Sequence, residues 1–220
     1  NNDSAYETAI EFKKNGIDPI VLDTREEQNS ELINDAKNQG IQIKFSHAVA
    51  VANGYKKVKS AKIGKLNSNK TGFENIEIVQ CDCICVSGFW TPTVHLTSQS
   101  GNKLKFNKDI DAFVPDKSKQ KETTIGAANG SFTLKETIEK SFESGADVGK
   151  KLTENQVNIQ VPSVTEKKHK THDKFWCSPL PKNENPKRFV DFQNDVSVAD
   201  IELALREGYR SIEHVKRYTT

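Results

Sequence analysis

The sequence lacks methionine, long apolar runs and a strong charge of either sign. None of its 220 residues is methionine and only four are cysteine, which is too few for a disulfide scaffold and indicates a reducing, cytoplasmic compartment. No apolar stretch approaches the roughly 20 residues that a membrane-spanning helix needs. The net charge of +2 gives no field directed at nucleic acid or a membrane surface, so neither partner is predicted.

Recognisable catalytic and metal-binding patterns are also missing. No Ser-His-Asp, Cys-His or paired-carboxylate arrangement follows from the spacing, so no catalytic residue is predicted and the segment alone is expected to be inactive. The run "CDCIC" places Cys81, Cys83 and Cys85 on one face of a predicted strand. Structural zinc sites typically use Cys-x₂₋₄-Cys pairs, whereas free cysteine packs like a small apolar residue. We therefore predict reduced, buried and metal-free thiols.

The first 45 residues alternate between helical and strand patterns. A helix is predicted over residues 2–15, a short buried strand over 19–23, a helix capped by Ser30 and ending at Gly40, and a strand over 41–45. This order predicts a βαβ-type unit whose first strand lies before residue 1.

The middle of the chain follows a different pattern. Asn53-Gly54 lies between two runs that can pair, which predicts a hairpin, and "NIEIVQCDCICVSG" supplies a third strand of an antiparallel meander. A small hairpin is expected around Gly101, and a strand at residues 122–125 before a glycine turn and a long helix. The polar, proline-rich residues 151–186 are predicted to form a linker or an arm lying on another surface.

Two helices are predicted at the C-terminal end of the sequence. Ser197 and Asp200 have the spacing of a capping box at the start of the first helix, and Gly208 separates it from the second.

The opening turn is one candidate nucleotide site. If Ala5 is the last position of a G-x-G-x-x-G/A turn, Asn2 replaces the middle glycine, and Asp23 ends the next strand where an acid would bind a ribose. Because an asparagine side chain occupies space that the phosphates need, the sequence favours a nucleotide-type fold that has lost its ligand over a working site.

The stretch "GAANGSF", Gly126 to Phe132, is the second candidate. Its small residues precede a helix, so backbone N–H groups could face a ligand. A tight turn that packs two elements together explains the same residues equally well.

Three stretches resemble the alpha subunits of heterotetrameric sarcosine oxidases. They are "NNDSAYETA", "VSGFWTPTVHLTSQSG…AFVPD…GAANGSFTL" and, most specifically, "FVDFQNDVSVADIELALREGYRSIEHVKRYTT". The resemblance runs along nearly the whole chain and implies an internal segment of a longer subunit. It implies an α/β, glutathione/thioredoxin-reductase-like dinucleotide-binding fold. Residues 1–76 would be an inserted second nucleotide-type fold, 77–150 the returning part of the first, 151–186 a polar arm and 187–220 the start of a small helical domain.

The resemblance also implies cofactors and partners. This subunit would hold NAD near Ala127, Phe132 and Leu134, with Gly126 and Gly130 shaping the turn, while FAD and FMN would belong to the assembly and tetrahydrofolate to a downstream domain. Beta, gamma and delta subunits would be the partners, and sarcosine the substrate. Two alternatives stay open: the alpha subunit of an opine or proline dehydrogenase, and a non-catalytic docking scaffold. The absence of cysteine after Cys177 favours the sarcosine side, since several dehydrogenase relatives carry iron–sulfur cysteines there.

Overall fold

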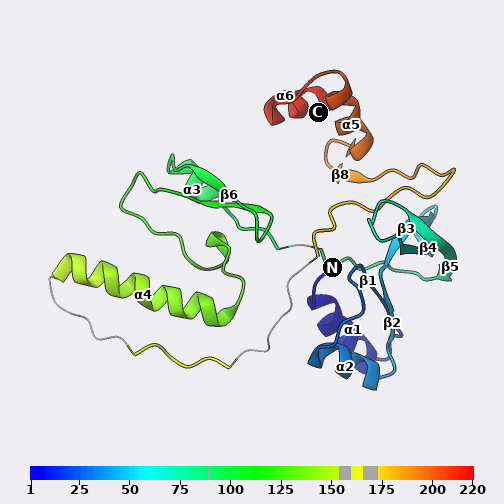
Figure 1. The fold of residues 1–220 in the computed structure, drawn as a ribbon, viewed down its shortest axis with the longest axis horizontal. Helices are drawn as coiled ribbons and strands as arrows, with labels where there is room; N and C mark the ends of the chain where they lie inside the picture. Colours follow the sequence, from blue (N-terminus) through cyan, green and yellow to red (C-terminus); the bar gives the residue numbers. More distant parts are fainter. Residues whose placement is uncertain (89, 154–159, 166–172) are drawn as a thin grey trace. The chain divides into compact units, whose positions relative to one another are not determined.

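The computed structural model describes residues 1–88, 90–153, 160–165 and 173–220. It is a mixed α/β chain, as the sequence predicts, and it divides into two compact units, each described by itself below (Figure 1). The first unit comprises Asn1, Asp3–Ser87 and Phe175–Thr220, and the second comprises Asn2 and Gly88–Lys174. His169 and His172, for which the sequence predicts a solvated environment, lie outside the described residues.

The predicted βαβ arrangement is present at the start of the first unit. Helix α1 (Ser4–Lys14) precedes strand β1 (Ile20–Asp23), helix α2 (Glu31–Asn38) and strand β2 (Gln42–Phe45). Strands β1 and β2 pair in parallel, and the two helices lie beside them in Figure 1. The Ser30 hydroxyl accepts a hydrogen bond from the Ile33 N–H at 3.3 Å, so the predicted helix cap is confirmed.

The apolar stripes of the two helices form the core of this part. Its buried residues are Tyr6, Ala9, Ile10, Val21, Ile33, Ala36 and Ile41. Burying a side chain the size of isoleucine contributes about 1.5–3 kcal/mol, so this small set is the main source of stability here.

The antiparallel meander follows directly. Strands β3 (His47–Gly54), β4 (Val58–Leu66) and β5 (Phe73–Gln80) form one three-stranded sheet. The predicted hairpin at Asn53-Gly54 is confirmed, with its turn over residues 55–57. The predicted continuation of the third strand through the cysteines is wrong, because β5 ends at Gln80.

The proline-rich arm lies partly on this meander. The Ser178 hydroxyl donates to the Val49 carbonyl at 2.7 Å, and the Lys62 ammonium lies 2.6 Å from the Glu184 carboxylate. Pro179 and Pro181 are buried. Residues 178–184 thus behave as the surface-bound arm that the composition predicts.

The second unit contains helix α3 (His95–Gln99), strands β6 (Leu104–Asn107) and β7 (Ala112–Pro115), the 3₁₀ helix η1 (Gly126–Asn129) and helix α4 (Leu134–Thr153). The hairpin turns at residues 108–111 rather than around Gly101, which instead ends α3 with a φ of 78°. Residues 122–125 belong to none of the described strands, so the predicted strand there is wrong.

The C-terminal helices follow a two-stranded ladder of β8 (Phe189–Asp191) and β9 (Val196–Ser197). Helices α5 (Val198–Arg206) and α6 (Ile212–Thr219) are separated at Gly208, whose φ is 95°. The Asp200 carboxylate accepts from the Ser197 N–H at 2.8 Å, and the predicted capping box is confirmed. Across the described ranges, no helix is both long and apolar enough to cross a membrane.

Candidate functional site

The turn from residue 126 to 134 takes a shape that depends on its two glycines. Gly126 and Gly130 have φ values of 70° and 81°, and the Ser131 N–H returns to the Gly126 carbonyl at 3.1 Å. A left-handed φ suits glycine because it has no Cβ to clash with the backbone. Gly130 follows the end of η1 at Asn129, and the helix predicted after the small residues, α4, begins at Leu134.

The space beside each glycine is filled by the chain itself. A Cβ at Gly130 would lie 2.8 Å from Ile110 Cδ1 and 3.3 Å from Val114 Cγ1, and one at Gly126 would lie 3.3 Å from Thr137 Cγ2. The glycines therefore let the turn pack against the β6–β7 hairpin and against α4. This geometry supports the tight-turn interpretation for the glycines.

Helix α4 holds the turn through one buried hydroxyl. Ser131 is 1% exposed, and its hydroxyl accepts a hydrogen bond from the Lys140 ammonium at 2.6 Å. Thr137 also donates to the Ser131 carbonyl at 3.2 Å. These bonds fix the turn to the first two turns of α4, so its outward-facing side chains have a defined position.

The remaining predicted site residues face outward. Ala127 is exposed, Phe132 is 36% exposed and Leu134 is 56% exposed, and Leu134 opens the 20-residue helix α4. Flat apolar surface suits the rings of a nucleotide, and the positive end of a helix dipole favours phosphate. The turn can therefore form one wall of a dinucleotide site.

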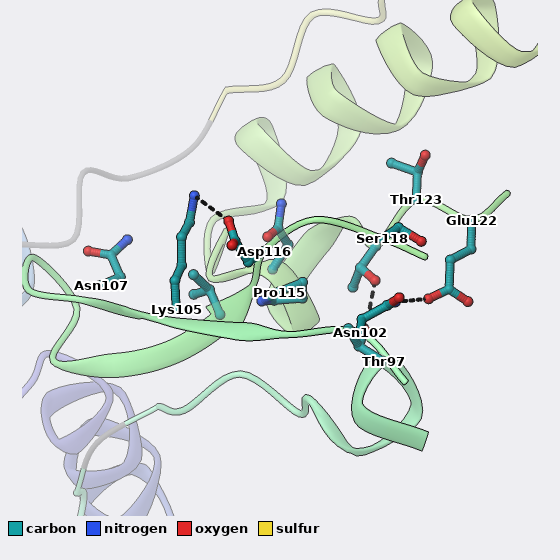
Figure 2. Close-up of a pocket in the computed structure, with 12 residues that line it drawn as sticks. Thr97, Asn102, Lys105, Asn107, Pro115, Asp116, Ser118, Glu122 and Thr123 are labelled. Atoms are coloured by element: carbon teal, nitrogen blue, oxygen red, sulfur yellow. Dashed lines mark hydrogen bonds and ion pairs between the residues drawn. The ribbon is translucent and has the colours of Figure 1, made fainter. Parts of the chain in front are cut away.

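A shallow polar pocket of about 510 Å³ lies against the same turn (Figure 2). Its lining residues come from α3, the hairpin, the segment 116–124 and η1: Thr97, Asn102, Lys105, Asn107, Val114, Pro115, Asp116, Ser118, Glu122, Thr123, Thr124 and Asn129. Asn129 belongs to the predicted "GAANGSF" stretch. Trp90 and His95 do not line this pocket, and both are exposed.

Both carboxylates of this pocket already have partners. Glu122 accepts from the Asn102 amide and, at 3.0 Å, from the Ser100 hydroxyl, while the Lys105 ammonium lies 3.8 Å from Asp116. Figure 2 shows Asn102–Glu122 and Lys105–Asp116 as separate pairs. The pocket therefore offers hydroxyl and amide groups for hydrogen bonding and has no arrangement of a nucleophile with a base.

The acid at the end of β1 is occupied by this chain's own side chains. Asp23 is 2% exposed and accepts hydrogen bonds from the Tyr6 hydroxyl at 2.6 Å and from the Arg25 guanidinium at 2.8 Å. The same Arg25 nitrogen lies 2.8 Å from Asp3. An acid buried in this way has no lone pair directed at solvent for a ribose hydroxyl.

These contacts determine the charge states of the cluster. Burial disfavours the charged form of Asp23, yet the hydrogen bonds from Arg25 and Tyr6 outweigh it and hold the pKa of that carboxyl below its usual value. Burial similarly opposes the charge on Arg25, but Asp23 and Asp3 raise the pKa of the guanidinium. Burial and the bond to Asp23 raise the pKa of Tyr6. Within the cluster, Tyr6 is thus a neutral phenol, Arg25 a cation and Asp23 a carboxylate.

The opening turn at Asn2 is likewise occupied by hydrogen bonds within the chain. Asn2 is 8% exposed and its side-chain amide donates to the Gly88 carbonyl. Together with the Asp23 contacts, this arrangement supports the interpretation that the inserted nucleotide-type fold at the start of the chain has lost its ligand. Sequence reasoning missed Arg25, although an arginine two residues after a strand-ending aspartate is a visible signal.

The cysteines depart from the prediction. All four are free thiols, but Cys83 and Cys85 are exposed and Cys81 is only half-buried, so the expected core packing is wrong. The physical reason is that β5 ends at Gln80, so the residues after it leave the sheet that was expected to bury them. Among the described residues, no cluster of three or more histidine, cysteine or acidic side chains is arranged to hold a metal ion.

Comparison with known proteins confirms the resemblance inferred from the sequence. Residues 185–220 match the family model of the sarcosine oxidase A3 domain. The whole chain is 27% identical to a sarcosine oxidase subunit alpha from Corynebacterium sp. strain P-1 and 26% identical to one from Rhizobium meliloti strain 1021. It spans 23% and 21% of their respective lengths.

A solved structure also resembles the chain. It is the L-proline dehydrogenase from P. horikoshii, with a TM-score of 0.46, 17% identity, and coverage of 91% of this chain and 39% of that one.

Proposed function

We propose that this chain is a segment of the alpha subunit of a heterotetrameric sarcosine oxidase, in which it binds a dinucleotide and supports the assembly. The observation that carries the proposal is similarity along the full chain to three subunits of that name. Among the described residues, a polar pocket and the absence of a cluster of three or more histidine, cysteine or acidic side chains for a metal suit a supporting segment of a larger enzyme.

The assembly would demethylate sarcosine oxidatively to glycine. The one-carbon unit would pass to tetrahydrofolate, bound elsewhere in the alpha subunit, and the electrons would pass through FAD and FMN to oxygen with release of peroxide. Beta, gamma and delta subunits would complete the enzyme in the cytoplasm. The residues of this segment would hold and orient groups and would not exchange protons with the substrate.

NAD is the dinucleotide that we assign to the turn at residues 126–134. Its nicotinamide ring, when bound, supplies a hydride acceptor. Phe132, Leu134 and Ala127 would contact the dinucleotide through their exposed surfaces, and the start of α4 would favour its phosphates. Gly126 and Gly130 would act indirectly, by setting the path of the backbone beneath those contacts.

The test is NAD binding by the complete alpha subunit carrying Phe132→Ala. Phe192→Ala is the matched control, since Phe192 is 83% exposed and belongs to the first unit. We expect affinity for NAD to fall at least about tenfold in the first variant, a loss of roughly 1.4 kcal/mol, and to be unchanged in the second. Unaltered binding by Phe132→Ala would remove the dinucleotide from this turn.

Docking on partner subunits is a second candidate role, and α4 is the observation that favours it. The helix has 20 residues and none of them is buried, although it carries apolar side chains such as Val148 and Leu152, which are 46% and 79% exposed. Leu152→Lys should then reduce recovery of the partner subunits with the alpha subunit while leaving NAD binding intact. Full recovery of the partners would count against docking through α4.

A further inference from the structure

We propose that Cys83 and Cys85 form a peroxide-sensitive dithiol site, which closes to an intrachain disulfide and reopens with a thiol reductant. The site is independent of the proposed oxidase activity, because the oxidant it needs is hydrogen peroxide from any source. The proposal rests on the distance between the two sulfurs and on the exposure of both residues to solvent.

The two sulfurs are close enough to react. Cys83 Sγ and Cys85 Sγ lie 3.8 Å apart, and both residues are exposed. A disulfide bond is about 2.05 Å long, so the sulfurs must approach by a little under 2 Å, which side-chain rotation about χ1 can contribute. The residues lie beyond the end of β5, and the β4–β5 pairing that the structure describes ends at Gln80.

The other two cysteines serve as internal comparisons. Cys81 has the same spacing to Cys83 as Cys85 has, but it is half-buried and its N–H is bonded to the Lys59 carbonyl at 3.2 Å beside the sheet. Cys177 is exposed and lies 3.3 Å from the Arg188 guanidinium. The geometry therefore assigns the disulfide to Cys83–Cys85 rather than to Cys81–Cys83.

The chemistry has two steps. One sulfur, as thiolate, attacks a peroxide oxygen, the O–O bond breaks and a sulfenic acid forms with release of one water after protonation. The second sulfur then attacks the sulfenic sulfur, forms the S–S bond and displaces a second water. In sum, two thiols and one hydrogen peroxide give one disulfide and two waters.

The contact between the two sulfurs also affects how readily one of them ionises. The hydrogen bond with Cys83, together with partial burial, raises the pKa of the Cys85 thiol, so Cys85 retains its proton more tightly than an isolated cysteine. Either sulfur can begin the reaction, because both residues are exposed and the two sulfurs share one contact.

The experiment is peptide mapping of the complete alpha subunit after treatment with dilute peroxide and blocking of residual thiols. Trypsin cuts after Lys70 and Lys103, so Cys81, Cys83 and Cys85 fall in one peptide and Cys177 in another. We expect the first peptide to lose two hydrogens and to regain them with dithiothreitol. Tandem mass spectra should place the blocking group on Cys81.

Four single serine variants identify which two cysteines form the disulfide. The loss of two hydrogens should persist in Cys81→Ser and Cys177→Ser, and should vanish in Cys83→Ser and Cys85→Ser. In each of the last two variants, the remaining cysteine of the pair should accumulate as sulfenic acid, because the sulfur that would resolve it is missing. A disulfide that survives in Cys85→Ser and disappears in Cys81→Ser would overturn the proposal. So would peroxide treatment that leaves all thiols of the wild-type protein blockable.

Discussion

Replacing Arg25 with alanine would leave two buried carboxylates without their cation. One Arg25 nitrogen lies 2.8 Å from Asp3 and 2.8 Å from Asp23, and the carboxylate side chains are each only 2% exposed. Removing one member of a buried ion pair typically costs about 3–5 kcal/mol. A small domain has only about 5–15 kcal/mol of stability in total, so the first unit should come close to unfolding at pH 7.

Protonation of a buried carboxyl limits how much free energy of unfolding Arg25→Ala can remove, and it makes that loss depend on pH. A carboxyl whose unfolded pKa is about 3.9 can be neutralised at pH 7 for roughly 4 kcal/mol, and at pH 5 for only about 1.5 kcal/mol. The destabilisation by Arg25→Ala should therefore shrink by about 2–3 kcal/mol between pH 7 and pH 5, because a carboxyl with a raised folded pKa stabilises the fold less as the pH rises.

The wild-type protein should behave in the opposite sense. The folded pKa of Asp23 is held below its usual value, so the stabilisation from this group is complete above the unfolded pKa of about 3.9. It is lost as the pH falls through the lower, folded pKa. Between pH 5 and pH 7 the contribution of Asp23 should not change.

Urea unfolding followed by circular dichroism, at both pH values, tests the reasoning. Lys13→Ala is the control, because Lys13 pairs with Asp18, whose side chain is 87% exposed, and such surface pairs contribute only about 0–1 kcal/mol. If Arg25→Ala costs under about 1 kcal/mol at pH 7, or costs the same at pH 5, the cluster is not held as described.

Two further predictions concern the turn and the last helices. Gly130→Val should destabilise the second unit by about 2–4 kcal/mol, because it forces a branched residue to a φ of 81° with its Cβ 2.8 Å from Ile110, as thermal unfolding would show. Gly145→Ala, within α4 and with no atom near the new methyl, should instead stabilise by up to about 1 kcal/mol, and a similar loss in both variants would contradict the steric argument. Ser197→Ala should cost about 0.5–2 kcal/mol by removing the cap of α5, measurable as reduced protection of the first turn from hydrogen exchange.

The sequence predicted correctly those features that depend on contacts between residues close in the chain. The Ser30 cap and the capping box at Ser197 depend on residues only a few positions apart, and both are present. The cysteine run shows where local signals fail. Its alternating apolar pattern suits a strand, but β4 begins at Val58, and Ser60 already pairs with Gln80, so β5 has almost no partner beyond that point.

The candidate site depends more on contacts between distant residues. The glycines of the turn at 126–134 were found from composition, but the Ile110 side chain that explains Gly130 comes from a hairpin that the sequence placed elsewhere. The hydrogen bond from Tyr6 to Asp23 depends on how α1 packs against β1. Such contacts cannot be read from periodicity, because no spacing rule specifies which buried groups will meet.

The first unit is interrupted in sequence, and this has a consequence for how the chain is made. Ser4 Oγ lies 2.5 Å from Ser87 Oγ, and the Asn1 amide donates to the Phe175 carbonyl at 3.5 Å, so the exit and re-entry points are held by the same short segment. The Lys62–Glu184 pair joins residues separated by 122 positions. A ribosome that has just completed β5 has therefore not yet made the arm that covers the meander, and the intervening residues must emerge first. Neighbouring ends also mark where a short peptide could replace the whole insertion and leave the interrupted unit able to close on itself.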